Sequence, residues 1–277
     1  ALREARATLD RATAPVKYPR NYVFSSNGCA IVGLTVEAWH ACTPGNATCS
    51  TDGQNFYNAL DQPLDAEGEP DPEGRSRESV FAFLREHSPE LIPSARLVFA
   101  KPSVMRLDRR SGATPMPGAT CTVEDLAEPD PDDPRLLRSC VGGVQGRPYS
   151  TWVCCGSFHA EMHKVQKRSP TTDIVAMADD YALNDAPPVV CRAYNTKISH
   201  QKTALGLFEA IDKAAIYSPT GDLSMVPATI PGSPNHGDGA IRCFKMIGTY
   251  FGDQDACSRA VQQRLVGKLA PLDVLDR

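Results

Sequence analysis

The residues best suited to chemistry lie in "WVCCGSFHAEMHKVQ", residues 152–166, which carries His159, Glu161 and His163. The apolar residues of this stretch recur at helical spacing, so we expect a helix over 157–166. His159 and His163 are four residues apart, and their rings could therefore bind one zinc or copper ion. A metal site needs a third ligand that the local sequence does not identify. Histidines at the surface or at the edge of the core are the alternative interpretation.

The fragment "FHAEM" resembles the first zinc motif of the cytidine deaminase family, in which a histidine binds zinc and a nearby glutamate moves protons. This resemblance implies that His159 is a zinc ligand and that Glu161 is the acid and base of a deamination. The family also has a P-C-x-x-C motif. Its nearest counterpart here is "PPVVCRAYN", where two valines separate Pro188 from Cys191 and no second cysteine follows. The resemblance therefore covers one short motif.

A second pair of candidates lies in "PGSPNHGDGA", residues 231–240, where His236 and Asp238 share a glycine-rich loop. A loop histidine beside an aspartate could act as a base with its orienting carboxylate. The alternative is that the two residues only form a turn. The sequence contains no G-x-S-x-G, no G-x-x-x-x-G-K-[ST] and no H-E-x-x-H, so no complete catalytic signature is present.

The cysteines give the strongest compositional signal, because ten is an even and high number for 277 residues. None forms a C-x-x-C pair, and this pattern favours disulfides in an oxidising compartment. The alternative is a set of reduced thiols that serve as small core residues inside a cell. Asn46, in an Asn-Ala-Thr tripeptide, is a candidate for glycosylation. The disulfide candidates are Cys29, Cys42, Cys49, Cys121, Cys140, Cys154, Cys155, Cys191, Cys243 and Cys257.

Composition narrows the class of protein. With 42% hydrophobic and 22% charged residues, the chain can bury a substantial core. The net charge is −4 and the basic residues are scattered, so we expect no nucleic acid partner. No apolar run reaches about 18 residues, which predicts that nothing spans a membrane. We expect an extracytoplasmic protein whose targeting segment has been removed.

The pattern of helices and strands that must position these residues predicts a single α+β domain over 1–277. We expect a mainly antiparallel sheet, several packed helices and disulfide stabilisation. A subdivision is expected near 111–135. Beyond the helix over 157–166, alternation and β-branched runs predict strands, and helical periodicity with caps predicts helices. The strands are expected over 29–39, 95–100, 103–107 and 240–251, and the helices over 1–13, 76–89, 199–217 and 253–271.

These observations favour a non-enzymatic, secreted structural or binding subunit of a larger protein assembly. It would be a disulfide-bonded oligomer with protein partners, and we expect no cofactor. The alternative is a secreted metal-dependent or hydrolytic enzyme that uses His159, Glu161 and His163, with zinc as its cofactor.

Overall fold

The computed structural model describes residues 21–23, 27–61, 63–69, 78–99, 103–106, 136–139 and 150–269. Its centre is a four-stranded antiparallel sheet with the strand order β4-β5-β1-β6. Two separate antiparallel ribbons pair β2 with β3 and β7 with β8. The strands are β1 (Ala47–Thr51), β2 (Ser103–Arg106), β3 (Leu136–Ser139), β4 (Asp173–Met177), β5 (Asp180–Asp185), β6 (Ala215–Tyr217), β7 (Cys243–Met246) and β8 (Thr249–Gly252).

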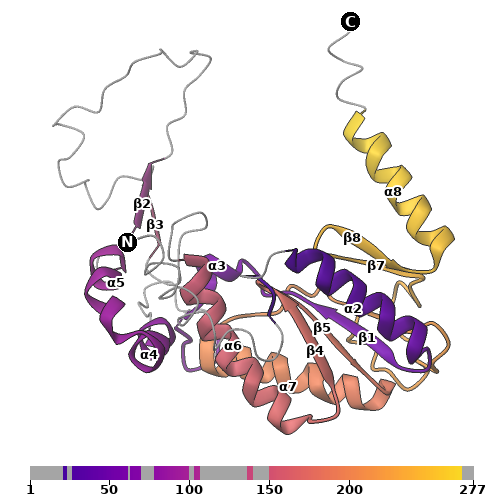
Figure 1. Cartoon of the computed structure of the whole chain (residues 1–277), viewed down its shortest axis with the longest axis horizontal. Coiled ribbons are helices and arrows are strands. Elements are labelled where there is room, and N and C mark those ends of the chain that lie inside the picture. The colour runs from indigo at the N-terminus through magenta and orange to yellow at the C-terminus, as the bar shows by residue number, and fades with distance from the viewer. Residues whose placement is uncertain are drawn as a thin grey trace, which may run out of the picture.

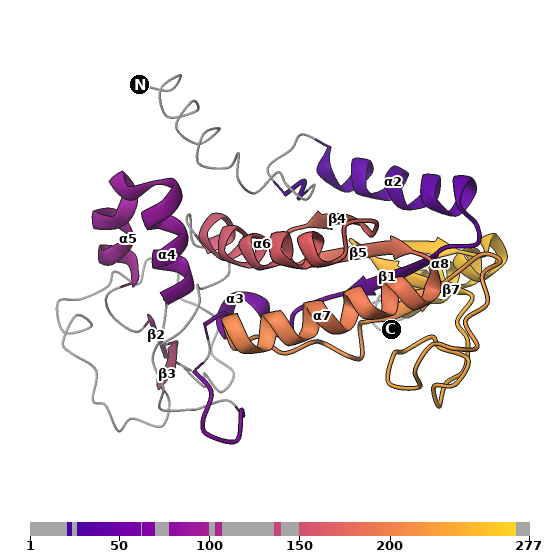
Figure 2. The ribbon, with the colours of Figure 1, turned by 90° about the horizontal axis from the view of Figure 1, so that it is seen from below.

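Helices cover both faces of the sheet. In Figures 1 and 2, α6 and α7 lie against one face, and α2 lies against the other together with the β7–β8 ribbon. No helix in the part of the chain described here is long and apolar enough to cross a membrane. The helices are α2 (Gly28–Cys42), α3 (Phe56–Ala59), α4 (Glu78–His87), the 3₁₀ turn η2 (Pro89–Leu91), α5 (Ile92–Phe99), α6 (Ser150–Arg168), α7 (Pro187–Leu205) and α8 (Gln254–Leu269).

The sheet separates two apolar clusters, because side chains alternate between the faces of a strand. Ile174 and Leu183 pack toward α6 and α7. Val175 and Ala182, their sequence neighbours, pack toward α2 and the β7–β8 ribbon. A strand buried on both faces lacks the alternation of apolar and polar residues that reveals a half-exposed strand.

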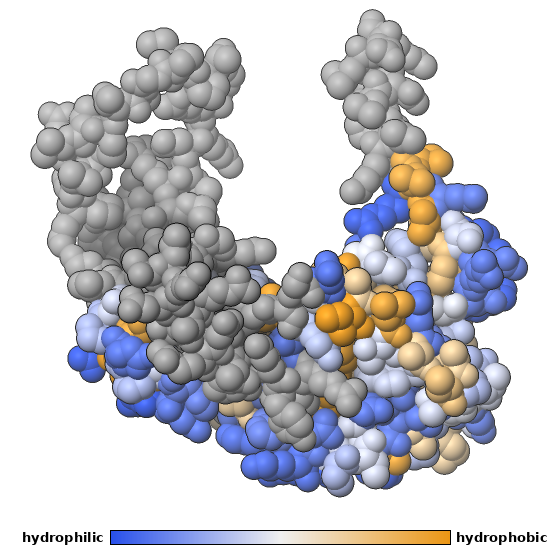
Figure 3. Space-filling model, viewed as in Figure 1, coloured by the Kyte–Doolittle hydropathy of each residue, from blue (hydrophilic) through white to orange (hydrophobic). Residues whose placement is uncertain are grey.

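Helix α6 packs closely against α4. Gly156 allows this approach, since a Cβ atom at that position would lie 2.3 Å from the ring of Phe83. Phe158, Met162 and Val165 are fully buried, which confirms the predicted apolar stripe. Exposed large apolar side chains include those of α8, at the upper right of Figure 3, and Leu34 on α2.

Several predicted elements are confirmed and others are wrong. The mixed α+β class, the antiparallel sheet, α4, β2 and α8 agree with the predictions, and the expected strand over 240–251 is a ribbon of two. The predicted strand over 29–39 is wrong, because this segment forms α2, and 95–100 overlaps α5. The predicted helix over 199–217 ends in α7 at Leu205, and its last residues form β6.

The predicted disulfide stabilisation is wrong. The cysteines within the described residues form no disulfides, and Cys49, Cys154, Cys155 and Cys191 are buried. Cys154 and Cys155 lie inside α6, where they pack as small apolar side chains. The remaining candidates with free thiols are Cys29, Cys42, Cys243 and Cys257, whereas Cys121, Cys140 and the segments 1–13 and 111–135 lie outside the described residues.

Candidate active site

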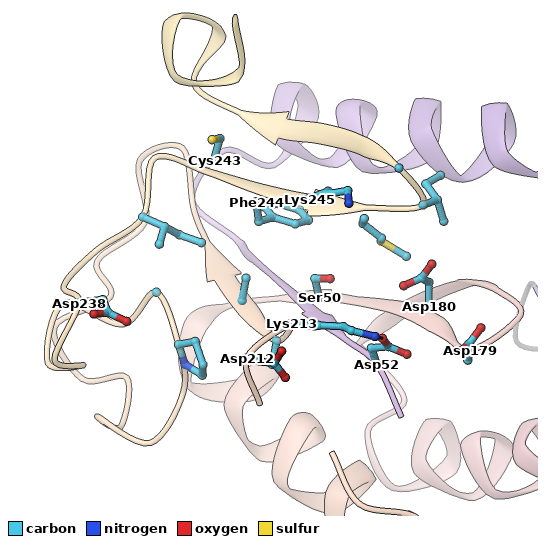
Figure 4. Close-up of a pocket in the computed structure, with 18 residues that line it drawn as sticks. Ser50, Asp52, Asp179, Asp180, Asp212, Lys213, Asp238, Cys243, Phe244 and Lys245 are labelled. Atoms are coloured by element: carbon cyan, nitrogen blue, oxygen red, sulfur yellow. Dashed lines mark hydrogen bonds and ion pairs between the residues drawn. The ribbon is translucent and has the colours of Figure 1, made fainter. Parts of the chain in front are cut away.

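A cavity of about 680 Å³ lies between the sheet and the β7–β8 ribbon. Figure 4 shows Asp52, Asp179, Asp180 and Lys213 gathered on the sheet side of this cavity, with Phe244 across from them on the ribbon. The acidic residues come from the residue that follows β1 and from the β4–β5 hairpin, two segments more than 120 positions apart in the sequence. Folding alone brings them together.

The β4–β5 turn places two of the carboxylates. Met177 pairs with Asp180, so that Ala178 and Asp179 form a two-residue turn. Ala178 has a φ of 58°, a region that costs a residue with a Cβ atom about 1–2 kcal/mol. Buried Asn21 holds this conformation: its side-chain amide donates to the carbonyl of Ala178 (3.1 Å), and its side-chain oxygen accepts from the backbone N–H of Ala178 (3.3 Å). Such strain is common at functional sites.

The register of the sheet places the third carboxylate. Thr51 is opposite Tyr181, so that the next residues along, Asp52 and Asp180, come close together beyond the end of β1. The backbone carbonyl of Asp52 accepts a hydrogen bond from the N–H of Ala210 at 2.9 Å. The strand end is therefore anchored, and the side chain of Asp52 lines the cavity.

The site carries more negative than positive charge. Burial and repulsion from Asp52 raise the pKa of Asp179 to about 6. Burial and repulsion from Asp179 and Asp52 raise the pKa of Asp180 to about 6 as well. Lys213 Nζ lies 2.7 Å from Asp52 Oδ2, and this pairing raises the pKa of Lys213. The other oxygen of Asp52, Oδ1, is buried and has no hydrogen-bond partner among the described residues.

These residues fit a divalent cation. Nowhere in the described ranges are three or more His, Cys, Asp or Glu side chains placed so that together they could hold a metal ion. Magnesium does not require three such ligands, because it keeps several waters and binds through one or two carboxylates. A cation here would engage the unpartnered Oδ1 of Asp52 and relieve the repulsion that raises the pKa of Asp179 and Asp180.

The predicted histidine site is not assembled. His159 is buried, and burial and the nearby His163 lower the pKa of His159 to about 3, so its ring is neutral. No third ligand joins His159 and His163 in the part of the chain that the structure describes. Glu161 instead pairs with Lys164 at 2.7 Å and with His200 at 3.5 Å. The deaminase-like role of Glu161 has no support in this geometry.

The other candidates, His236, Asp238 and Asn46, make hydrogen bonds within the fold, and their chemical roles stay predictions. His236 Nδ1 lies 3.7 Å from an Asp238 carboxylate oxygen and accepts the backbone N–H of Asp238 at 3.3 Å, as expected for a turn. Asp238 stands at the rim of the cavity, away from Asp179 (Figure 4). The side-chain amide of Asn46 donates to the side chain of Asn184 at 3.1 Å, next to β1.

No model of a known protein family matches the chain, and no curated protein does. Among solved structures, the fold is similar to that of apo telomerase from Candida tropicalis truncated from its C-terminal domain. The TM-score is 0.50 at 12% identity, over 91% of this chain and 44% of that one. A telomerase from Candida albicans in complex with a TWJ fragment of telomeric RNA gives a TM-score of 0.46 at 12% identity, over 90% and 36% of the respective chains. This chain spans less than half the length of either telomerase.

The shared fold and the free thiols correct the predicted function. The extracytoplasmic, secreted structural subunit is wrong, and so is the exclusion of nucleic acid. An even number of cysteines also arises when thiols fill core positions, as the buried ones do here. A net charge of −4 averages over the whole chain, so it does not describe the charge of one local surface.

Proposed function

We propose that the chain catalyses metal-dependent nucleotidyl transfer to a nucleic acid, with Asp52, Asp179 and Asp180 as the cation-binding residues. The observation that carries this proposal is the convergence of the three carboxylates in one cavity of a fold similar to that of a telomerase. Nuclease and phosphatase sites also use paired divalent ions. The fold favours the polymerase among these classes.

The transfer joins the 3′ oxygen of a primer to the α-phosphorus of a nucleoside triphosphate and releases pyrophosphate. When bound, two divalent ions stabilise the attacking and the leaving oxygens of such an in-line displacement. Asp52 approaches from β1, while Asp179 and Asp180 approach from the hairpin turn, so the carboxylates face the cavity from two strands. Positioning of this kind supplies most of the catalysis in phosphoryl transfer.

Lys213 complements the carboxylates. Its ammonium pairs with Asp52, and 61% of its side chain remains exposed. It therefore lowers the negative potential that would otherwise repel a triphosphate from the cavity. Lys245, on the ribbon, lines the same cavity from the other side.

The test is primer extension by the purified 277-residue chain on RNA and DNA templates, with deoxynucleoside triphosphates and Mg²⁺ or Mn²⁺. We expect extension by the wild type and a loss of at least about a thousandfold in Asp179→Asn, because charge stabilisation by the ions is the main catalytic contribution. Asp173→Asn is the matched control: it makes the same change at the exposed start of the same hairpin.

Two outcomes would overturn the proposal. One is a wild type that extends no primer and whose melting temperature does not respond to Mg²⁺. The other is equal extension by the wild type and Asp179→Asn. Shortening of the primer, in place of extension, would assign a nuclease.

A further inference from the structure

A buried ion pair lies behind Asp52, on the face of the sheet that α7 covers. Lys197 on α7 is fully buried, and its Nζ is 2.5 Å from Glu209 Oε2. The side-chain amide of Gln201 donates to the same oxygen at 3.0 Å. Oε1 of Glu209 accepts from the hydroxyl of Thr51. Both carboxylate oxygens are therefore satisfied, as a buried charge requires.

The ion pair is also hydrogen-bonded to the backbone of Asp52, the residue that follows Thr51. Glu209 Oε1 also accepts the backbone N–H of Asp52 at 3.2 Å. The following residue, Ala210, donates its N–H to the carbonyl of Asp52 at 2.9 Å. Gln54 N–H donates to the carbonyl of Phe208 at 2.8 Å. The segment 208–210 thus holds both backbone polar groups of Asp52.

The position in the sheet explains why a side chain does this. Strand β6 pairs with β1 only as far as Ser50, so no strand neighbour accepts the N–H of Asp52 on that side. Glu209 supplies the missing acceptor, and hydrogen bonds to an ionised acceptor are about twice as strong as neutral ones. A buried ion pair can often be replaced by apolar residues without loss of stability. Apolar side chains could not, however, accept this N–H.

We infer that Glu209, held by Lys197, is a positioning residue that fixes the end of β1 so that Asp52 presents its carboxylate to the cation. The inference rests on the proposed function, since it assigns Glu209 a role at that site. Glu209 itself faces the helices through Lys197 and Gln201 and does not line the cavity.

Two charge-neutral double variants separate positioning from stability. Lys197→Met/Glu209→Gln keeps a side-chain oxygen for the N–H of Asp52, and Lys197→Met/Glu209→Leu removes it. Because neither leaves an unpaired buried charge, both are expected to fold. The measurements are hydrogen exchange of the Asp52 amide by NMR, Mg²⁺ affinity by calorimetry, and kcat and KM for primer extension.

We expect the glutamine variant to keep Mg²⁺ affinity within about threefold of wild type. The leucine variant should lose protection of the Asp52 amide, bind Mg²⁺ about tenfold more weakly and lose about ten- to a hundredfold in kcat, with KM for the nucleotide nearly unchanged, because small misplacements reduce catalysis strongly. Equal protection and equal Mg²⁺ affinity in the two variants would overturn the inference. So would equal losses in both folded variants.

Exchange and Mg²⁺ affinity do not depend on activity. If the wild type fails to extend primers but the two variants still differ in both, the proposed function fails and the positioning role stands. If the leucine variant does not fold, Thr51→Val replaces it, because it removes the hydroxyl that bridges Lys197 and Glu209 at constant volume. A severalfold weaker Mg²⁺ affinity is expected there, and unchanged affinity would overturn the inference.

Discussion

Two charged clusters lie on opposite faces of β1, and one peptide bond, between Thr51 and Asp52, joins them. On the helix side, Lys197 and Glu209 are one cation and one anion, both buried and hydrogen-bonded. On the cavity side, Asp52, Asp179 and Asp180 gather around the exposed Lys213, and a buried oxygen of Asp52 has no hydrogen-bond partner among the described residues.

The difference between the two clusters supports a structural role for the buried ion pair and the functional role proposed for the cavity carboxylates. The fold can satisfy a buried charge completely, as it does for Glu209, so the surplus of carboxylates in the cavity is not a limit of the architecture. Strongly raised pKa values with identified charged neighbours are concentrated at functional sites. The raised pKa values of Asp179 and Asp180, together with the positive φ of Ala178, support the cation-binding role proposed for this cavity.

The largest expected effect comes from breaking the ion pair of Lys197 and Glu209 on the helix side. Lys197→Met leaves Glu209 buried without its cation, which should lower the free energy of unfolding by about 3–5 kcal/mol. Urea denaturation at pH 7 measures this. Lys202→Met, on the exposed side of the same helix, is the control and should cost less than about 1 kcal/mol. Similar losses in both variants would show that the burial of Lys197 does not set the cost of removing it.

Removing a carboxylate from the cavity side should instead raise the free energy of unfolding. The pKa of Asp179 is raised from 3.8 to about 6, so the folded state binds this proton more tightly than the unfolded state does. Stability that is present below about pH 4 is therefore lost as the pH rises to 6. Asp179→Asn removes this loss, and at about 1.4 kcal/mol for each pKa unit, discounted for coupling to Asp52, it should stabilise by roughly 1–3 kcal/mol at pH 7.

Urea denaturation at pH 7 and pH 4, without divalent cations, checks this prediction. The gain should vanish at pH 4, and Mg²⁺ should reduce it at pH 7 because the wild type alone would be stabilised by binding. A variant that is less stable than the wild type at pH 7 would contradict the electrostatic account of the cavity.

The helices with a clear apolar periodicity could be predicted from the sequence, but the candidate site could not. Long amphipathic segments such as α4 and α8 follow from periodicity and caps. The strand prediction over 29–39 relied on β-branched content, yet Val32, Val36 and Trp39 lie at helical spacing and form the buried side of α2. A run of this length is more typical of a helix than of a strand.

The missed carboxylates differ in how visible they are. "DIVAMADDYALND" contains two apolar runs joined by two aspartates, which is the pattern of a buried hairpin with an acidic turn and could have drawn attention to Asp179 and Asp180. β1 is "ATCST", fully buried but without a large apolar side chain, so Asp52 had no such signal. The roles of Lys213 and Glu209 depend on contacts across the fold that no local pattern encodes.

The smallest expected effect on stability is that of replacing Lys213, the lysine beside the cavity carboxylates. Lys213 is 61% exposed, so Lys213→Met should change the free energy of unfolding by less than about 1 kcal/mol. Its ammonium occupies Asp52 Oδ2, however, and competes there with an incoming cation. At pH 8, where Asp179 and Asp180 are ionised, the variant should bind Mg²⁺ a few times more tightly, because the carboxylates lose a competing positive charge. Calorimetric titration measures this, with Lys245→Met as a comparison across the cavity. Weaker Mg²⁺ binding by Lys213→Met would contradict this prediction. It would mean that Lys213 orients Asp52 by pairing with it, as Lys197 holds Glu209 on the helix side of β1.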